Sequence, residues 1–215
     1  MLRAAIFDFD DTLMATRLRR NDILIAALAD FGYTVDFDQI SAHWGERFDL
    51  LVKALAPGIP YPEFHGHYAN MIARVPPRRQ PGIDTLLAQL RDADILVAVV
   101  TSGSRDLVIQ DLRAGGLWDS IWGLFACEDT EYHKPDPRVL SPVRDRFAGL
   151  GIGPADVCYV GDSGADHAVA VANDIRFFAV LTGSDTAADF ARLGLGPNHI
   201  LNTLEQCTIT VLDRA

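Results

Sequence analysis

The chain has 215 residues, of which 49% are hydrophobic and 22% are charged, a composition typical of folded globular proteins and unlike that of disordered ones. Its formal net charge of −10 disfavours a surface that follows the phosphates of nucleic acid, so we expect no nucleic-acid partner and a local cation for any anionic substrate. The sequence shows no secretory signal and no apolar run near the ~18 residues of a membrane span, which together predict a cytoplasmic protein without a membrane partner. Its three cysteines, far apart and odd in number, fit that reducing compartment.

Short apolar runs alternate with helix-like stretches through most of the chain. The runs have the length and the continuous apolarity of strands that are buried on both faces. They cover residues 4–7, 95–100, 124–127, 157–160 and 177–181, and the helical stretches cover residues 82–93, 104–114, 137–149 and 165–172. This alternation predicts an α/β fold in which a Rossmann-like, doubly wound parallel sheet carries helices on both faces.

Residues 15–80 interrupt this alternation. Apolar residues recur there at helical spacing, Gly32 is placed to end the first helix, and three prolines stop the last one. We therefore predict a helical cap at residues 15–80, inserted after the first strand, and a discontinuous catalytic core formed by residues 1–14 and 81–215. No convincing strand is expected within the cap.

Four carboxylates follow two of the predicted strands, at the edge where open α/β sheets bind their ligands. Asp8 and Asp10 follow the first strand, and the period of two along a strand turns both to one side. Asp162 follows the fourth strand, and Asp166 lies one helical turn further on. These acids would repel one another without a cation. Mg²⁺ prefers carboxylate oxygens, and the set contains no histidine or cysteine for zinc, so we predict a Mg²⁺ site.

The two other strand ends add groups that suit an anion. Thr101 and Ser102 lie at the entrance of a predicted helix, where a hydroxyl and a backbone N–H are placed to bind phosphate. Lys134 adds a fixed positive charge in the loop after the third strand. Together with the acids, these residues describe a phosphoryl-transfer site.

The four segments, in this order along the chain, resemble the four motifs of the haloacid dehalogenase-like hydrolase superfamily. They are DFDDTL at residues 8–13, Thr101, Lys134 within HKPDP, and GDSGADHA at residues 161–168. The predicted insertion is similar to the α-helical cap of phosphoglycolate phosphatase-like members. The resemblance covers nearly the whole chain. It implies a Mg²⁺-dependent phosphatase whose partner is a small phosphorylated metabolite, a phosphomonoester such as phosphoglycolate, a sugar phosphate or a nucleotide.

The resemblance also implies a role for each matched residue. Asp8 would attack the phosphorus and form an aspartyl-phosphate, and Asp10 would protonate the leaving oxygen and then deprotonate the attacking water. Thr101 and Lys134 would bind the oxygens of the transferring phosphoryl group. The carboxylates of Asp8 and the fourth motif, with the backbone carbonyl of Asp10, would hold the metal.

The cap carries weaker signals. HWGERF at residues 43–48 resembles the cap loop that often meets substrate, and Arg47 is the residue expected to bind substrate there, with a surface salt bridge as the alternative interpretation. Arg17, Arg19 and Arg20 are interpreted as a solvated basic face, and a contribution of positive charge to the cleft is the alternative.

Two further positions are interpreted as structural. Trp44 is expected to pack and not to bind a base. Asp11 stands where relatives often carry glycine, so it is interpreted as a turn residue that shapes the passage to the cap.

Other functions stay open at this stage. A β-phosphoglucomutase-like phosphomutase would use the same core, although MATRLRRND at residues 14–22 lacks the histidine expected there. A 2-haloacid dehalogenase is disfavoured by Asp10, and a phosphonate hydrolase by its need for Lys53 as the imine-forming lysine. A non-catalytic binding or regulatory module on this fold is the alternative from another class. The oligomeric state, monomer or homodimer, is left open.

Overall fold

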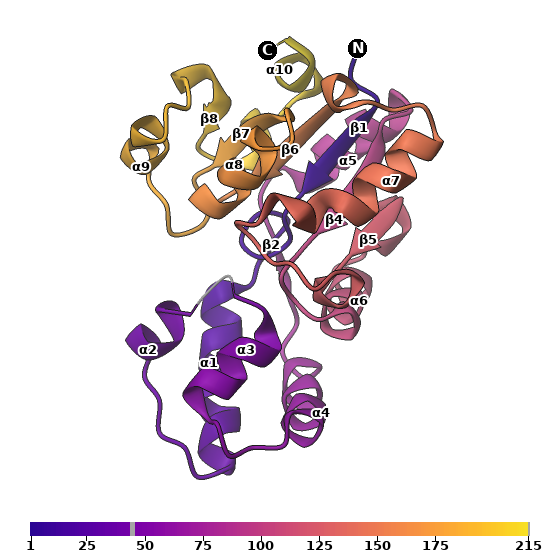
Figure 1. Ribbon diagram of the computed structural model, residues 1–215. Coiled ribbons are helices and arrows are strands. Elements are labelled where there is room, and N and C mark those ends of the chain that lie inside the picture. Colours follow the sequence, from indigo (N-terminus) through magenta and orange to yellow (C-terminus); the bar gives the residue numbers. More distant parts are fainter. Residues whose placement is uncertain (44–45, 215) are drawn as a thin grey trace.

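The computed structural model describes residues 1–43 and 46–214 (Figure 1). At its centre lies a six-stranded sheet with the strand order β5-β4-β1-β6-β7-β8, in which every neighbouring pair is parallel. The strands are β1 (Ala4–Phe7), β4 (Leu96–Val100), β5 (Gly123–Phe125), β6 (Val157–Gly161), β7 (Arg176–Val180) and β8 (Ile200–Leu201). The strand expected at residues 124–127 ends at Phe125, because the chain turns into a 3-10 helix there.

Helices cover both faces of this sheet. The α-helices are α5 (Ile83–Asp92), α6 (Arg105–Ala114), α7 (Ser141–Gly149), α8 (Gly164–Val171), α9 (Ala187–Arg192) and α10 (Ile209–Arg214). The 3-10 helices are η1 (Trp118–Ser120), η2 (Cys127–Asp129), η3 (Pro137–Leu140), η4 (Pro154–Asp156), η5 (Pro197–His199) and η6 (Leu204–Gln206). The predicted Rossmann-like, doubly wound α/β fold is confirmed.

The alternation along β1 shows how the two faces are built. Ala5 and Phe7 pack into an apolar cluster with α5, α6 and α10, whereas Ala4 and Ile6 pack into a second cluster with α7, α8 and α9. All four side chains are fully buried. Burial on both faces explains why the central strands read as continuous apolar runs.

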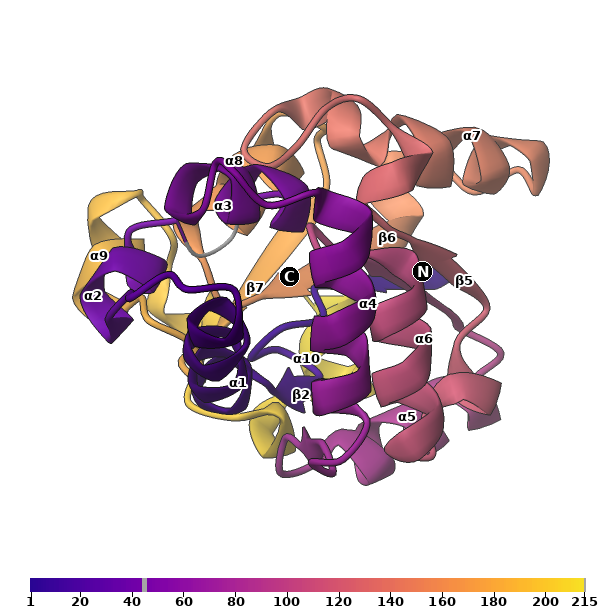
Figure 2. The ribbon, with the colours of Figure 1, turned by 90° about the horizontal axis from the view of Figure 1, so that it is seen from below.

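Four further helices form the inserted segment: α1 (Arg17–Asp30), α2 (Phe37–Ser41), α3 (Phe48–Leu55) and α4 (Tyr61–Ile72). All four helices contribute to one apolar cluster, which is separate from the two clusters of the sheet. Leu24, Ile40, Val52 and Phe64 are examples, one from each helix. Gly32, at φ +83°, ends α1 in the left-handed conformation that glycine favours. Figure 2, seen from below, shows α1 and α4 side by side in front of the sheet. Among the residues with described positions, no helix is long and apolar enough to cross a membrane.

Two short segments connect the inserted helices to the sheet, and they pair with each other as β-strands. β2 (Met14–Ala15) runs antiparallel to β3 (Arg78–Arg79). The expectation of no strand in residues 15–80 is therefore wrong at both ends of the insertion. The apolar pattern gives no sign of these strands because each has two residues and the arginines are exposed. The division into a cap at 15–80 and a core stays a prediction.

Asp11 holds this passage in place. It adopts φ 57°, in the left-handed region that aspartate tolerates better than most residues, so its interpretation as a turn residue is confirmed. Its carboxylate accepts hydrogen bonds from the backbone N–H groups of Thr16 and Arg17, at 3.0 and 3.1 Å, at the start of α1. Its backbone carbonyl accepts one from the Gln80 side chain at 2.8 Å. One residue thus ties the outgoing chain to the returning chain.

Candidate active site

One cavity of about 240 Å³ lies at the carboxyl ends of β1, β4 and β6, between the sheet and the inserted helices. It gathers seven of the eight predicted site residues: Asp8, Asp10, Thr101, Ser102, Lys134, Asp162 and Asp166. The inserted helices and the loop before α3 close the cavity from the other side, with Arg20, Leu24, Glu46, Phe48, Leu51 and Tyr68. The site is therefore shared between segments that are far apart in the sequence.

Three buried carboxylates form the centre of the site. Asp8, Asp162 and Asp166 each offer an oxygen, and these oxygens lie within 4.8 Å of one another. Lys134 lies among them, with its Nζ 2.6 Å from a carboxylate oxygen of Asp8 and 2.6 Å from one of Asp166. The Lys134 ammonium also donates to the backbone carbonyl of Val100 at 3.0 Å. A buried lysine in such a position needs these acceptors, because an unpaired buried charge is costly.

The electrostatics of the centre call for a further cation. Burial raises the pKa of Asp8 to about 7; the charge of Lys134 opposes this shift, and those of Asp166 and Asp10 add to it. Burial, followed by the charges of Asp8, Asp166 and Asp11, raises the pKa of Asp162 well above its ordinary value. For Lys134, burial favours the neutral form, but Asp166 and Asp8 outweigh it and raise the pKa of the amine. One lysine does not neutralise three acids, and the all-oxygen donor set fits a hard divalent cation such as Mg²⁺.

Asp166 is fixed by its place in the first turn of α8. Its carboxylate accepts hydrogen bonds from the hydroxyls of Tyr159 at 2.8 Å and Ser163 at 2.6 Å, and Ser163 caps the helix in return. Glycines leave room for the acids. A Cβ at Gly161 would lie 2.7 Å from the Asp166 carboxyl, and one at Gly183 would overlap the carboxylate of Asp162. The sequence analysis did not identify Gly183, although a glycine three residues after the end of β7 was a usable signal.

Asp10 lines the same cavity, but its carboxylate lies outside the group of three acids. Its carboxylate accepts a hydrogen bond from the Thr16 hydroxyl at 2.6 Å and lies 2.8 Å from a guanidinium nitrogen of Arg20. Its carboxylate is not part of the three-acid group, so the predicted metal ligand at this residue would be its backbone carbonyl. The two acids at the end of β1 therefore have different surroundings: Asp8 beside a lysine and two acids, Asp10 beside an arginine and a threonine.

Arg20 lines the cavity, although the sequence analysis favoured a solvated position for it. The interpretation of Arg19 and Arg20 as part of a solvated face is wrong, since both side chains are more than nine-tenths buried. Both pair with Asp111 of α6 at 2.9 Å, and Arg20 also lines the cavity. A usable signal was Asp111 itself, an acid among the inward-facing residues of α6.

Thr101 and Ser102, which are predicted to bind an anion, both line the cavity. Thr101 is 2% exposed and lines the cavity beside Ser102 and Ser104. The backbone N–H of Thr101, predicted as a phosphate donor, instead donates to the Phe125 carbonyl at 3.0 Å, because the residue continues the pairing of β4 with β5. The Thr101 hydroxyl accepts from the backbone N–H of Gly103 at 3.0 Å, and its own hydrogen stays free for a ligand.

Arg47 is the one predicted site residue away from the cavity lining. Its guanidinium contacts the carboxylate of Asp49 at 3.1 and 3.2 Å, which matches the alternative interpretation as a salt bridge. Its neighbour Glu46 does line the cavity. A substrate contact of Arg47 stays a prediction, and Trp44 lies outside the described residues.

Known proteins resemble the chain in sequence. The family described as haloacid dehalogenase-like hydrolase matches residues 5–180. The plasmid form of phosphoglycolate phosphatase from Cupriavidus necator is 31% identical, over 94% of this chain and 90% of that protein. The chain belongs to the haloacid dehalogenase-like hydrolase family, and the predicted resemblance is confirmed.

Solved structures share the fold. A hydrolase from Pseudomonas syringae superposes with a TM-score of 0.76 at 20% identity, covering 95% of both chains. A β-phosphoglucomutase from Clostridium difficile superposes with a TM-score of 0.75 at 17% identity, covering 98% of this chain and 95% of that one. At these identities the likeness concerns the fold alone.

Proposed function

We propose that the protein is a Mg²⁺-dependent phosphatase that hydrolyses a small phosphomonoester through an aspartyl-phosphate on Asp8. The observation that carries the proposal is the position of Lys134, 2.6 Å from Asp8 and 2.6 Å from Asp166, with Asp162 completing a buried acidic group. A nucleophilic carboxylate, a cation and a donor set for a metal thus share one cavity. Family membership and the phosphatase among the relatives support the same reaction.

In the first half-reaction, an Asp8 oxygen bonds to phosphorus and the ester oxygen leaves with the electrons of the broken P–O bond. Lys134 holds the attacking carboxylate in place through its ion pair. Asp10 donates a proton to the leaving oxygen, so that an alcohol is released. Thr101 lines the cavity between these groups, and its hydroxyl donates to a phosphoryl oxygen.

In the second half-reaction, water attacks the phosphorus of the aspartyl-phosphate. Asp10, now a carboxylate, accepts the proton of that water, and the bond between phosphorus and Asp8 breaks. Inorganic phosphate and free Asp8 result, so the cycle closes with no other reactant. The ion pair with Arg20 and the hydrogen bond from Thr16 orient Asp10 for both transfers.

The metal would be held by the carboxylates of Asp8 and Asp162 and the carbonyl of Asp10, with Asp166 supporting the site. A bound Mg²⁺ supplies positive charge for the transferring phosphoryl group. The buried acids already favour a divalent cation on electrostatic grounds. As part of the same proposal, we place the protein in the cytoplasm, as monomer or homodimer, with its described cysteines free.

Orthophosphate release from p-nitrophenyl phosphate and a panel of phosphorylated metabolites tests the proposal. We expect release in Mg²⁺, none after EDTA, and recovery when Mg²⁺ is added back. Full activity in EDTA would contradict the proposed dependence of the reaction on Mg²⁺. No release from any compound would overturn the phosphatase.

A phosphomutase is the second candidate, since the β-phosphoglucomutase neighbour shares the fold. Arg20 stands within residues 14–22, where a histidine was expected for that activity, and it is bound between two carboxylates. Glucose 1-phosphate separates the two reactions. Phosphate migration without orthophosphate release would favour the mutase, and release would favour the phosphatase.

A further inference from the structure

We infer that the preferred substrates are small monoesters of uncharged, largely apolar alcohols, and that monoesters whose leaving group carries its own negative charge are poor substrates. Phosphoglycolate, the substrate in the name of the relative from Cupriavidus necator, belongs to the second class. The inference rests on the proposed function and narrows its substrate class.

The cations of the cavity are already committed. Among the lining residues that the structure describes, Arg20 and Lys134 are the positively charged ones. Lys134 is bound to Asp8 and Asp166 at the phosphoryl end. It is therefore part of the centre that receives the phosphoryl group, and it does not reach a second anion on the leaving group.

Arg20 is committed as well. Its guanidinium lies 2.8 Å from Asp10 and 2.9 Å from Asp111, and its side chain is 8% exposed. Arg19 also pairs with Asp111 at 2.9 Å, so two guanidiniums and two carboxylates balance one another in this group. A substrate carboxylate would have to compete with Asp10, the proposed acid and base, for the Arg20 guanidinium, and it would add an anion that this group has no cation left to pair.

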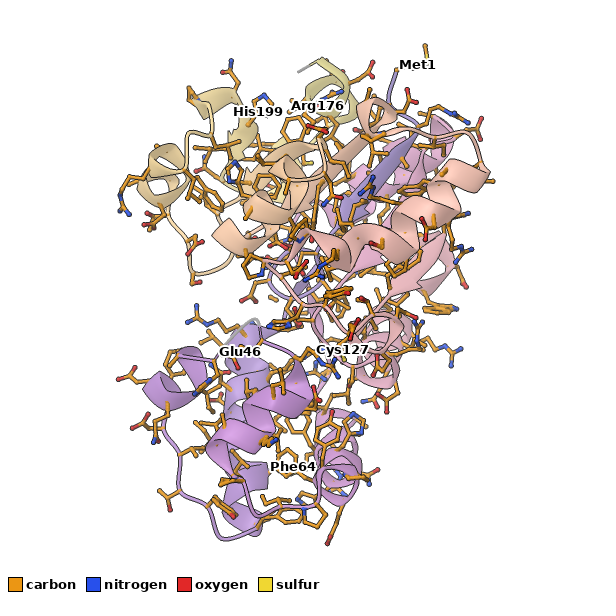
Figure 3. The ribbon with its side chains drawn as sticks, in the orientation of Figure 1. Met1, Glu46, Phe64, Cys127, Arg176 and His199 are labelled. Atoms are coloured by element: carbon orange, nitrogen blue, oxygen red, sulfur yellow. The ribbon has the colours of Figure 1, made fainter. Side chains whose placement is uncertain are left out.

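The charge at the cap side of the cavity is negative. Glu46 lines the cavity, and Figure 3 shows it at the edge of the inserted helices that faces the sheet. His43 lies 3.2 Å from Glu46, and both side chains are partly exposed. A substrate carboxylate near Glu46 would meet a like charge, whereas an uncharged group would not.

The rest of the leaving-group side is apolar. Leu24, Phe48, Leu51, Tyr68 and Leu107 line it, drawn from α1, α3, α4 and α6. Apolar surface of this kind stabilises an alcohol with a hydrocarbon or aromatic body by burying it. The cavity, at about 240 Å³, is below the usual range of roughly 300–1,000 Å³ for ligand pockets, so the alcohol is small.

A matched set of substrates tests the inference. Phosphoglycolate is compared with phosphoglycolamide, which has nearly the same shape but no carboxylate, and with benzyl phosphate, which adds an apolar ring. We expect kcat/KM for phosphoglycolate to be at least ~10-fold below that for phosphoglycolamide, with benzyl phosphate the best of the three. An equal or higher value for phosphoglycolate would overturn the inference and leave the phosphatase standing. No hydrolysis of any of the three or of p-nitrophenyl phosphate would instead count against the proposed function.

Glu46→Gln tests the origin of the selectivity. Removing this charge should reduce the ratio of kcat/KM for phosphoglycolamide to kcat/KM for phosphoglycolate at least ~3-fold. The kcat/KM for benzyl phosphate should change little. Glu63→Gln is the matched control, because Glu63 is an exposed acid of α4 outside the cavity lining. An unchanged ratio in Glu46→Gln, or the same change in both variants, would contradict the role given to Glu46.

Discussion

Arg20 of α1 lies 2.8 Å from the carboxylate of Asp10, which follows β1. The same guanidinium reaches Asp111 of α6 at 2.9 Å, so one side chain links an inserted helix to the sheet and to a helix of the sheet layer. The Thr16 hydroxyl holds Asp10 from the other side at 2.6 Å. The proposed acid and base is thus oriented entirely by residues at the start of the inserted segment.

Arg20→Gln should therefore impair proton transfer more than phosphate binding. We expect kcat/KM to fall roughly 10- to 100-fold for alkyl phosphates, whose leaving oxygen needs a proton, and several-fold less for p-nitrophenyl phosphate, whose leaving group does not. Arg20→Lys should recover part of the lost kcat/KM, since lysine restores the positive charge but not the planar guanidinium that pairs with two carboxylates at once. Steady-state kinetics on both substrates measure the split.

The exposed Arg113 of α6 provides the control for this prediction. Arg113→Gln should leave both substrates near the wild-type rates. An equal loss for alkyl and aryl phosphates in Arg20→Gln would point to a purely structural role and contradict the positioning of Asp10.

The buried acids predict a stabilising effect of Mg²⁺ that does not depend on turnover. At about 100 times its Kd, a metal that binds only the folded state adds ~2.7 kcal/mol, which corresponds to a rise in Tm of roughly 5–10 °C for a chain of this size. Asp162→Asn should abolish most of that rise. The exposed Asp119, changed to Asn, should keep it. Thermal unfolding with and without Mg²⁺ at constant ionic strength measures the rise in Tm for each protein. An undiminished rise in Tm for Asp162→Asn would place the ion elsewhere.

Two substitutions of Asp11 distinguish the effect of its charge on stability from the effect of its hydrogen bonds and turn conformation. Asp11→Asn keeps a side-chain oxygen for the N–H groups of Thr16 and Arg17 and tolerates φ 57°, and it removes a carboxylate whose pKa burial raises to about 6. We expect its free energy of unfolding to stay within about 1 kcal/mol of wild type. Asp11→Ala loses the cap and strains the backbone, for a cost of about 2–3 kcal/mol. Urea unfolding measures both, and equal losses would show that neither the cap nor the turn matters.

The cysteines predict slow chemical modification. Burial raises the pKa of the Cys127 and Cys158 thiols to about 12, and it shifts the pKa of Cys207 upward as well. Since the thiolate is the reactive form, iodoacetamide at pH 8 should label all three at least ~100-fold more slowly in the folded protein than in urea. Mass spectrometry of timed samples gives the rates. A cysteine that reacts equally fast in both states would contradict its buried position.

The sequence predicted the centre of the site well because each acid comes directly after a buried strand. Parallel strands end at one edge, so Asp8 and Asp162 had to meet, and one helical turn carries Asp166 to the same place. Lys134 sits in a loop, and its motif is weak when taken alone, so it was identified by its place in the order of the four motifs. In these cases the fold alone converts positions in sequence into proximity.

What the sequence could not predict depends on long-range pairing. Arg20 and Asp111 are 91 residues apart, and although the pattern of α6 turns Asp111 inward, the sequence does not say which cation it meets there. The two-residue strands β2 and β3 are too short to leave a periodic signal. The backbone N–H of Thr101, predicted to bind phosphate, donates instead to the Phe125 carbonyl of β5. This bond depends on how far β5 extends beside β4, which the sequence does not show.

The central claim is that Asp8 is the nucleophile, and the rate of orthophosphate release from p-nitrophenyl phosphate by Asp8→Asn in saturating Mg²⁺ tests it most directly. Asparagine keeps the size of the side chain but does not attack phosphorus, so we predict a loss of at least ~10³-fold in kcat while circular dichroism shows the fold retained. Release within tenfold of the wild-type rate by a folded Asp8→Asn protein would contradict the account.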